Sequence, residues 1–154
     1  MLSTLGHDLE LDVTRFDIRV DEAARSVDAS FDAASLRVAQ ALRAGKPSPL
    51  SDADRRTIED TARKEVLSSN RHPEIRYRST RVVDAPQGFD VTGRLTLRGE
   101  EREVFVALRR SGELYTTSVT LDQRTFGITP YAAMLGALRV KAEIVVRLSL
   151  PAVA

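Results

Sequence analysis

The alternation of apolar and polar residues near the C-terminal end constrains the fold of this chain more than any other feature. From Val140 to Leu150 every second residue is apolar, and the residues between them are polar apart from Val145. Successive side chains of a β-strand point to opposite faces, so this pattern predicts a long strand with one buried face.

The segment before that strand, residues 126–139, has a different composition. Pro130 has no N–H to donate and disfavours helical backbone in the residue before it. Gly127 and Gly136 bracket a stretch of small residues that also carries Met134 and Leu135. We expect one compact helical turn here, lying as an apolar lid over the mouth of a hollow β structure.

Alternation recurs along most of the chain and predicts about seven strands. Apolar residues occupy the odd positions from Phe89 to Leu97, and turn residues separate the successive runs. The apolar residues occupy odd positions before Thr14 and Arg15 and even positions after them, and the same change of parity follows Ala33. A bulge or a sharp bend would produce each change, and barrels use such bends to curve their strands. Residues 45–49 (GKPSP) are predicted to form a loop.

One helix is predicted, over residues 52–67. Ser51 is a suitable N-cap residue, and Ile58, Ala62 and Val66 form a narrow apolar stripe at a spacing of four residues. The other positions, including Glu59, are expected to form a solvated face, so the helix should lie on the surface of the barrel.

Bulk properties exclude several classes of protein. A chain of 154 residues is expected to form a single domain, 1–154. A net charge of +1 argues against a nucleic-acid-binding protein, and the absence of cysteine excludes disulfides and thiolate metal sites. The chain has no apolar run long enough to span a membrane and no secretory signal pattern, so we expect a cytoplasmic protein.

No catalytic or metal-binding set can be assembled from the sequence. The two histidines, His7 and His72, lie in different segments, and no nucleophile elbow or phosphate-binding loop occurs. The carboxylate pairs Glu59–Asp60 and Glu100–Glu101 are expected on solvated surface. We therefore expect no catalysis, no metal and no cofactor.

The inward positions leave two alternatives open. The chain has five phenylalanines, three tyrosines and no tryptophan, and many positions expected to face inward are small: Ala29, Ala33, Ser79, Gly93, Ala107, Ser118 and Ala142. Small side chains favour a ligand cavity, yet small barrels are also filled by their own side chains. The tyrosines combine an apolar body with a polar tip, so Tyr77, Tyr115 or Tyr131 is expected to meet the head group of a ligand.

Four segments resemble conserved segments of one protein family. In chain order they are residues 6–9 (GHDL), 72–79 (HPEIRYRS), 91–99 (VTGRLTLRG) and 126–144 (FGITPYAAMLGALRVKAEI). All four are similar to segments of the YceI-like, polyisoprenoid-binding family of lipocalin-like barrels, many members of which are exported.

The resemblance implies a mostly β fold, an antiparallel barrel of about eight strands, whose first strand is either split near Thr14 or incomplete. It also implies a long apolar ligand, isoprenoid or similar, held inside the barrel. A ligand-free packed barrel that serves as an interaction or stress-linked protein is the alternative, and a homodimer stays open. The residues expected to line the ligand are Leu9, Leu11, Phe31, Ile75, Tyr77, Phe89, Val91, Leu95, Phe126, Tyr131, Met134, Leu135, Val140 and Ile144.

Overall fold

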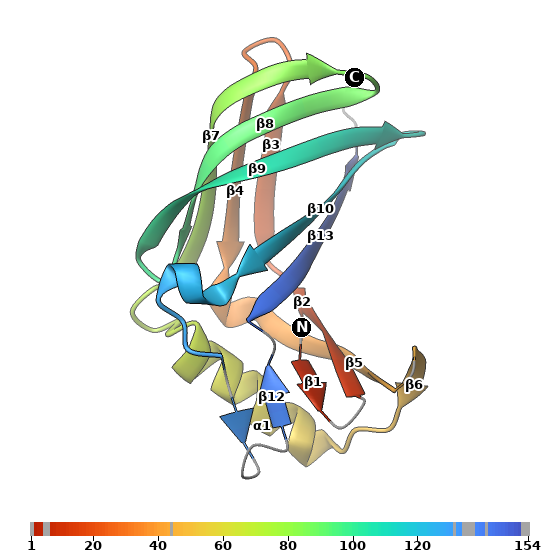
Figure 1. The fold of residues 1–154 in the computed structure, drawn as a ribbon, viewed down its shortest axis with the longest axis vertical. Coiled ribbons are helices and arrows are strands. Elements are labelled where there is room, and N and C mark those ends of the chain that lie inside the picture. Colours follow the sequence, from red (N-terminus) through yellow and green to blue (C-terminus); the bar gives the residue numbers. More distant parts are fainter. Residues whose placement is uncertain are drawn as a thin grey trace.

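Seven antiparallel strands curl into a half-barrel in the computed structural model, which describes residues 2–4, 7–43, 45–130, 132–133, 138–140 and 142–151 (Figure 1). In their order across the sheet, the strands are β13 (Glu143–Pro151), β10 (Leu114–Asp122), β9 (Glu100–Ser111), β8 (Gly88–Leu97), β7 (Glu74–Ala85), β4 (Ser26–Asp32) and β3 (Phe16–Asp21). The predicted mostly β, antiparallel, barrel-like fold is confirmed.

A second sheet lies at one end of the half-barrel, next to the helix (Figure 1). None of the helices in the described ranges is long and apolar enough to cross a membrane. The strands of this sheet are, in order, β11 (Ala132–Ala133), β12 (Leu138–Val140), β1 (Leu2–Thr4), β2 (His7–Val13), β5 (Leu36–Arg43) and β6 (Lys46–Ser48). The strand β6 lies in the segment that was predicted to be a loop, so that prediction is wrong.

Both changes of apolar parity mark places where the chain passes from one sheet to the other. Strand β2 ends before Thr14 and β3 begins after Arg15, while the short 3-10 turn η1 (Ala33–Ser35) separates β4 from β5. Backbone hydrogen bonds from Thr14 N to Ser35 O (3.3 Å) and from Asp32 N to Arg15 O (2.9 Å) hold the two breaks side by side. The predicted bend is confirmed, and the paired strands turn together out of the half-barrel.

The C-terminal strand is not continuous, contrary to the prediction. Its first part is β12, in the smaller sheet, and its second part is β13, at the edge of the half-barrel. At the break, the carbonyl oxygen of Ala142 accepts a hydrogen bond from Gln123 N (2.8 Å). The preceding segment was predicted to form a helical turn. Its Ala132 and Ala133 instead form strand β11, while residues 134–137 lie outside the described residues.

The predicted helix over residues 52–67 is confirmed as α1 (Asp52–Thr61), followed directly by the π-helical turn η2 (Ala62–Val66). The Ser51 side chain accepts a hydrogen bond from Asp54 N at 3.0 Å, which caps the first turn. Ile58 packs against a small cluster of Leu9, Val38 and Ala41 beneath the helix. The sequence therefore places both the cap and the apolar stripe correctly.

Most of the polar side of this helix is exposed as predicted, but the prediction of a solvated Glu59 is wrong. Glu59 is 8% exposed, and its Oε2 accepts a hydrogen bond from Val38 N at 2.9 Å. One turn away on either side, Arg55 Nη1 donates to Val38 O (2.9 Å) and Arg63 Nε donates to Leu36 O (3.0 Å). These three side chains satisfy the backbone of β5 where no strand pairs with it, and so protect a strand edge.

Candidate ligand-binding site

The concave face of the half-barrel gathers most of the residues expected to line a ligand. Tyr77, Val91, Leu95 and Phe126 are buried there in one hydrophobic cluster. Partly buried side chains expected at the same site pack against this cluster, namely Phe31, Ile75 and Phe89. Ile144 is partly buried on β13, opposite Leu121 of β10.

The structure does not bring Leu9 and Leu11 to this face. Leu9 belongs to the separate cluster beneath α1, and Leu11 is 36% exposed. Both lie on β2, which leaves the half-barrel at the bend after Val13. Val140 lies on β12 in the smaller sheet, and its side chain is outside the described part. Tyr131, Met134 and Leu135 also lie outside the described residues.

Tyr77 fills the space over Gly93, one of the small inward residues that favoured a cavity. Its ring lies over Gly93 of the neighbouring strand, so closely that a Cβ on Gly93 would lie 2.5 Å from Tyr77 Cζ. Its hydroxyl then donates a hydrogen bond to Val104 O on β9, at 3.0 Å. Burial, with a smaller contribution from the charge of Glu103, raises the pKa of Tyr77 to about 12. Ser118, also expected to face inward, is exposed on the outer face.

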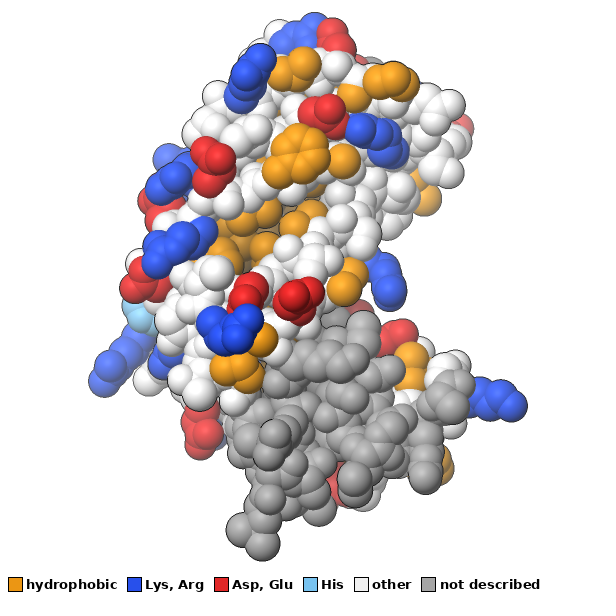
Figure 2. Space-filling model, in the orientation of Figure 1, with side chains coloured by type: hydrophobic (Ala, Val, Ile, Leu, Met, Phe, Trp, Pro, Cys, Tyr) orange, Lys and Arg blue, Asp and Glu red, His pale blue; other side chains and the backbone are white. Residues whose placement is uncertain are grey.

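A groove opens into the concave face between β9 and β10. These strands pair only from Ser111–Leu114 to Arg109–Thr116 and then diverge (Figure 1). The groove between them has a volume of about 330 Å³. Figure 2 shows hydrophobic side chains at the bottom of this hollow. The residues that line it are Arg102, Glu103, Val104, Phe105, Val119, Thr120, Leu121, Asp122, Thr125 and Phe126.

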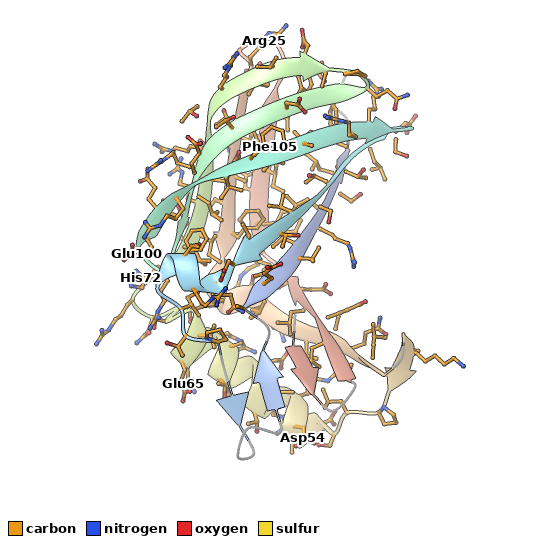
Figure 3. All side chains as sticks on the ribbon, viewed as in Figure 1. Arg25, Asp54, Glu65, His72, Glu100 and Phe105 are labelled. Atoms are coloured by element: carbon orange, nitrogen blue, oxygen red, sulfur yellow. The ribbon has the colours of Figure 1, made fainter. Side chains whose placement is uncertain are left out.

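Phe105 marks the outer lip of this groove. Its side chain is 58% exposed and projects from the outer side of β9 (Figure 3). Phe105 faces away from Val104 and Val106, as the alternation of side chains in a strand requires, but alternation alone does not show that it stands beside an opening. The sequence did not predict the groove. Whether two strands diverge depends on how far they pair with each other, and the alternation within a single strand carries no information about that pairing.

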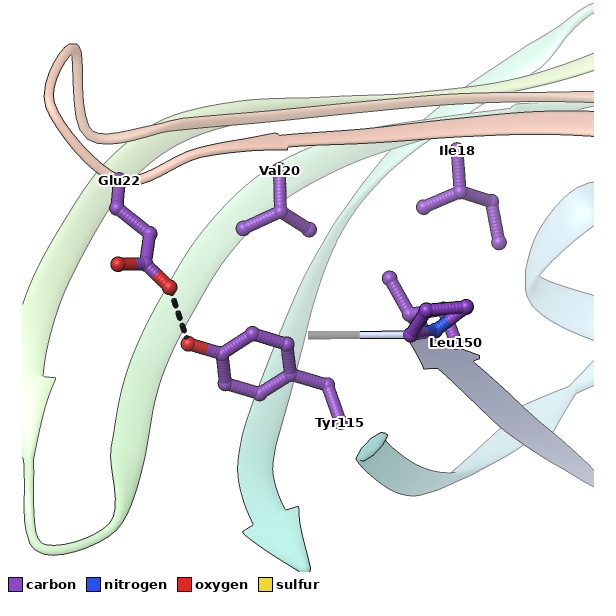
Figure 4. A pocket seen from close by; sticks show the side chains of 6 residues that line it. Ile18, Val20, Glu22, Tyr115 and Leu150 are labelled. Carbon is purple, nitrogen blue, oxygen red and sulfur yellow. Dashed lines mark hydrogen bonds between the residues drawn. The ribbon is translucent and has the colours of Figure 1, made fainter. Parts of the chain in front are cut away.

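A second, smaller pocket of about 130 Å³ lies at the other end of β10, lined by Ile18, Val20, Glu22, Tyr115, Leu150 and Pro151 (Figure 4). Among the described residues β3 pairs only with β4, and β13 only with β10, so these strands are the two edges of the sheet. The Tyr115 hydroxyl donates a hydrogen bond to Glu22 Oε1 at 2.5 Å. This bond raises the pKa of Tyr115 and links β10 to the turn after β3.

Charged side chains lie at the rims of the two pockets, but few charged or metal-ligating groups are buried. Glu59, on α1, is the only charged residue among the buried residues of the described ranges. Within those ranges no three histidine or carboxylate side chains gather as metal ligands. His72 lies beside Glu100 at the turn between β8 and β9 (Figure 3), with its ring against Gly99, where an added Cβ would lie 2.9 Å from His72 Cε1. The arrangement can bury an apolar molecule and offers few groups for acid–base chemistry.

Comparison with known proteins agrees with this geometry. The chain matches the family model of the YceI-like domain over residues 6–152. It superposes on a YCEI protein of Campylobacter jejuni with a TM-score of 0.66 and 9% identity, covering 93% of this chain and 83% of that one. For BcnA of Burkholderia cenocepacia the TM-score is 0.55 and the identity 17%, over 91% of this chain and 82% of that one. At these identities the two structures show a shared fold alone.

A search of curated proteins finds no match. The family model spans nearly the whole chain, from residues 6–9 (GHDL) to the end of β13. The chain belongs to the YceI-like family.

Proposed function

We propose that this protein binds a long apolar molecule, isoprenoid or similar, against the concave face of its half-barrel and catalyses no reaction on it. The observation that carries this proposal is the groove between β9 and β10, which leads from solvent to the buried cluster around Val91 and Phe126. Membership of the YceI-like family supports an isoprenoid chain as the ligand.

The driving force for such binding is the removal of apolar surface from water. Each buried CH₂ contributes about 0.8 kcal/mol, so one five-carbon unit contributes on the order of 3–4 kcal/mol. A groove of about 330 Å³ lies near the lower end of the range for ligand pockets, roughly 300–1,000 Å³. A long chain therefore needs the side chains around the groove to move apart, or it leaves one end in solvent.

A second function, a packed barrel that binds a protein partner and no small ligand, is favoured by one observation. The Tyr77 ring occupies the space over Gly93, so the concave face is filled at a position where the sequence suggested a cavity. The exposed Phe105 would then belong to an interaction surface.

Extraction of protein purified from its own host distinguishes the two functions. Wild-type protein should release an apolar chain in a near-stoichiometric amount, measured by mass spectrometry of the extract. Val119→Phe places extra volume in the groove and should abolish retention, whereas Val145→Phe adds the same kind of side chain on the exposed face of β13 and should not. Repeatedly empty wild-type extracts would favour the packed barrel.

A further inference from the structure

One hydroxyl group on the concave face has no hydrogen-bond partner among the described residues. Thr117 is 9% exposed, and its Oγ1 is buried without a partner. It lies on the same face of β10 as the buried Tyr115 and opposite Leu148 of β13, so its surroundings are apolar. A buried hydroxyl without a partner is destabilising by about 1–3 kcal/mol, and such groups in native proteins require an explanation.

The position of Thr117 supplies that explanation. Val119 and Leu121 of β10 line the groove, and Tyr115 of the same strand lines the smaller pocket. Thr117 lies between them on the same face. Thr117 itself lines neither pocket, and its Oγ1 is buried. A chain that enters at the groove and follows β10 towards the smaller pocket would reach this hydroxyl once the side chains around the groove move apart.

The two described tyrosines of this face are already hydrogen-bonded, although the sequence suggested that one of Tyr77, Tyr115 and Tyr131 meets the head group of a ligand. The Tyr77 hydroxyl already donates to Val104 O, and the Tyr115 hydroxyl already donates to Glu22. Among the described residues, Thr117 is thus the buried hydroxyl on this face that has both its proton and its lone pairs available.

We infer that Thr117 hydrogen-bonds an uncharged oxygen of the apolar ligand and thereby selects ligands that carry a hydroxyl or carbonyl group over plain hydrocarbons. The inference rests on the proposed function. A threonine hydroxyl both donates and accepts, so either kind of oxygen is a suitable partner. The partner oxygen is uncharged because no lysine or arginine is buried in the described part, and an unpaired charge there is very costly.

The test compares three probes that share one branched isoprenoid carbon skeleton: phytane (the saturated hydrocarbon), phytol (an alcohol with one double bond) and phytyl phosphate. Dissociation constants are measured on the full chain by gel filtration and quantification of the co-eluting probe. The variants are Thr117→Val, which keeps the shape and removes the hydroxyl, and Thr117→Ser, which keeps the hydroxyl. Ser118→Ala, which removes a hydroxyl from the opposite face of β10, is the control.

The ratio of the phytol to the phytane dissociation constant cancels changes that affect both probes. In Thr117→Val this ratio should rise roughly tenfold over wild type, as expected for the loss of one buried hydrogen bond. It should stay within about twofold of wild type in Thr117→Ser and in Ser118→Ala. The affinity for phytyl phosphate should not respond to Thr117→Val, since its charged group stays in solvent.

Each remaining outcome overturns a defined part of the argument. An unchanged ratio in Thr117→Val, with phytane still bound, refutes the role of Thr117 and leaves the proposed function intact. A tenfold response of phytyl phosphate to Thr117→Val refutes the uncharged head group. Failure of wild-type protein to bind any probe refutes the proposed function together with this inference. Urea unfolding should show Thr117→Val to be at least as stable as wild type without ligand, because the hydroxyl it removes is unpartnered.

Discussion

Replacing Glu59 with alanine should destabilise the protein by about 2–3 kcal/mol. Val38 is 3% exposed, and Glu59→Ala removes the acceptor of its N–H. A hydrogen bond that involves a charged group contributes about 1.5–3 kcal/mol, and a buried donor left unpaired forfeits its solvation. The ion pair of Glu59 with Arg63, at 3.7 Å and partly exposed, adds less than about 1 kcal/mol.

Urea unfolding followed by far-UV circular dichroism measures this loss. With a slope of about 2 kcal/mol per molar urea, the midpoint should fall by roughly 1–1.5 M. Glu59→Gln keeps an acceptor oxygen and should lose about 1 kcal/mol or less. The neighbouring Asp60 is exposed, so Asp60→Ala should change the free energy of unfolding by less than about 0.5 kcal/mol. A Glu59→Ala midpoint equal to that of Asp60→Ala would refute the role of the helix as a cover for the edge of β5.

Three further predictions concern Tyr77 with its neighbour Gly93, and the segment expected from the sequence to form a lid. Gly93→Ala should cost about 1–3 kcal/mol in urea unfolding, because its Cβ would lie 2.5 Å from Tyr77 Cζ and 2.6 Å from Arg78 O; a cost near zero would mean that the ring moves freely. Burial raises the pKa of Tyr77 from 10.0 to about 12, so the unfolded chain ionises first, and the stabilisation present below pH 10 is lost as the pH rises to about 12. Wild-type protein should therefore lose stability across this window more steeply than Tyr77→Phe, and parallel profiles would contradict the assignment. The double substitution of Met134 and Leu135 by aspartate should abolish ligand retention with an unchanged circular dichroism spectrum, while a retained ligand would exclude a lid at this segment.

Much of the fold could be predicted from the sequence, because the spacing of apolar residues in a strand or a helix reflects which of its side chains are buried. The odd positions from Phe89 to Leu97 face the core as predicted, and the helix begins after Ser51 as its cap requires. The parity change at Thr14 and Arg15 correctly located the bend between the two sheets. Each of these features is set by neighbours within a few residues.

The prediction of the candidate site was less complete because it depended on the assignment of strands to sheets. Phe31, Ile75, Tyr77, Val91 and the other residues on strands of the half-barrel come together as expected. Leu9 and Leu11 follow the same alternation, but they lie on β2, beyond the bend. Their shared face therefore belongs to the smaller sheet and not to the half-barrel. Alternation identifies a buried face and does not identify the layer against which that face packs.

The sequence by itself determined that this chain forms one-sided strands and a single helix, and which side chains of each strand share a face. Only the tertiary structure decided that β9 and β10 diverge, that Tyr77 covers Gly93 and that Glu59 is buried against β5. The last two depend on contacts between segments remote in the chain: 16 positions separate Tyr77 from Gly93, and 21 separate Val38 from Glu59. The groove and the unpartnered hydroxyl of Thr117 arise at that level, because strand pairing sets which backbone and side-chain groups are left without a neighbour.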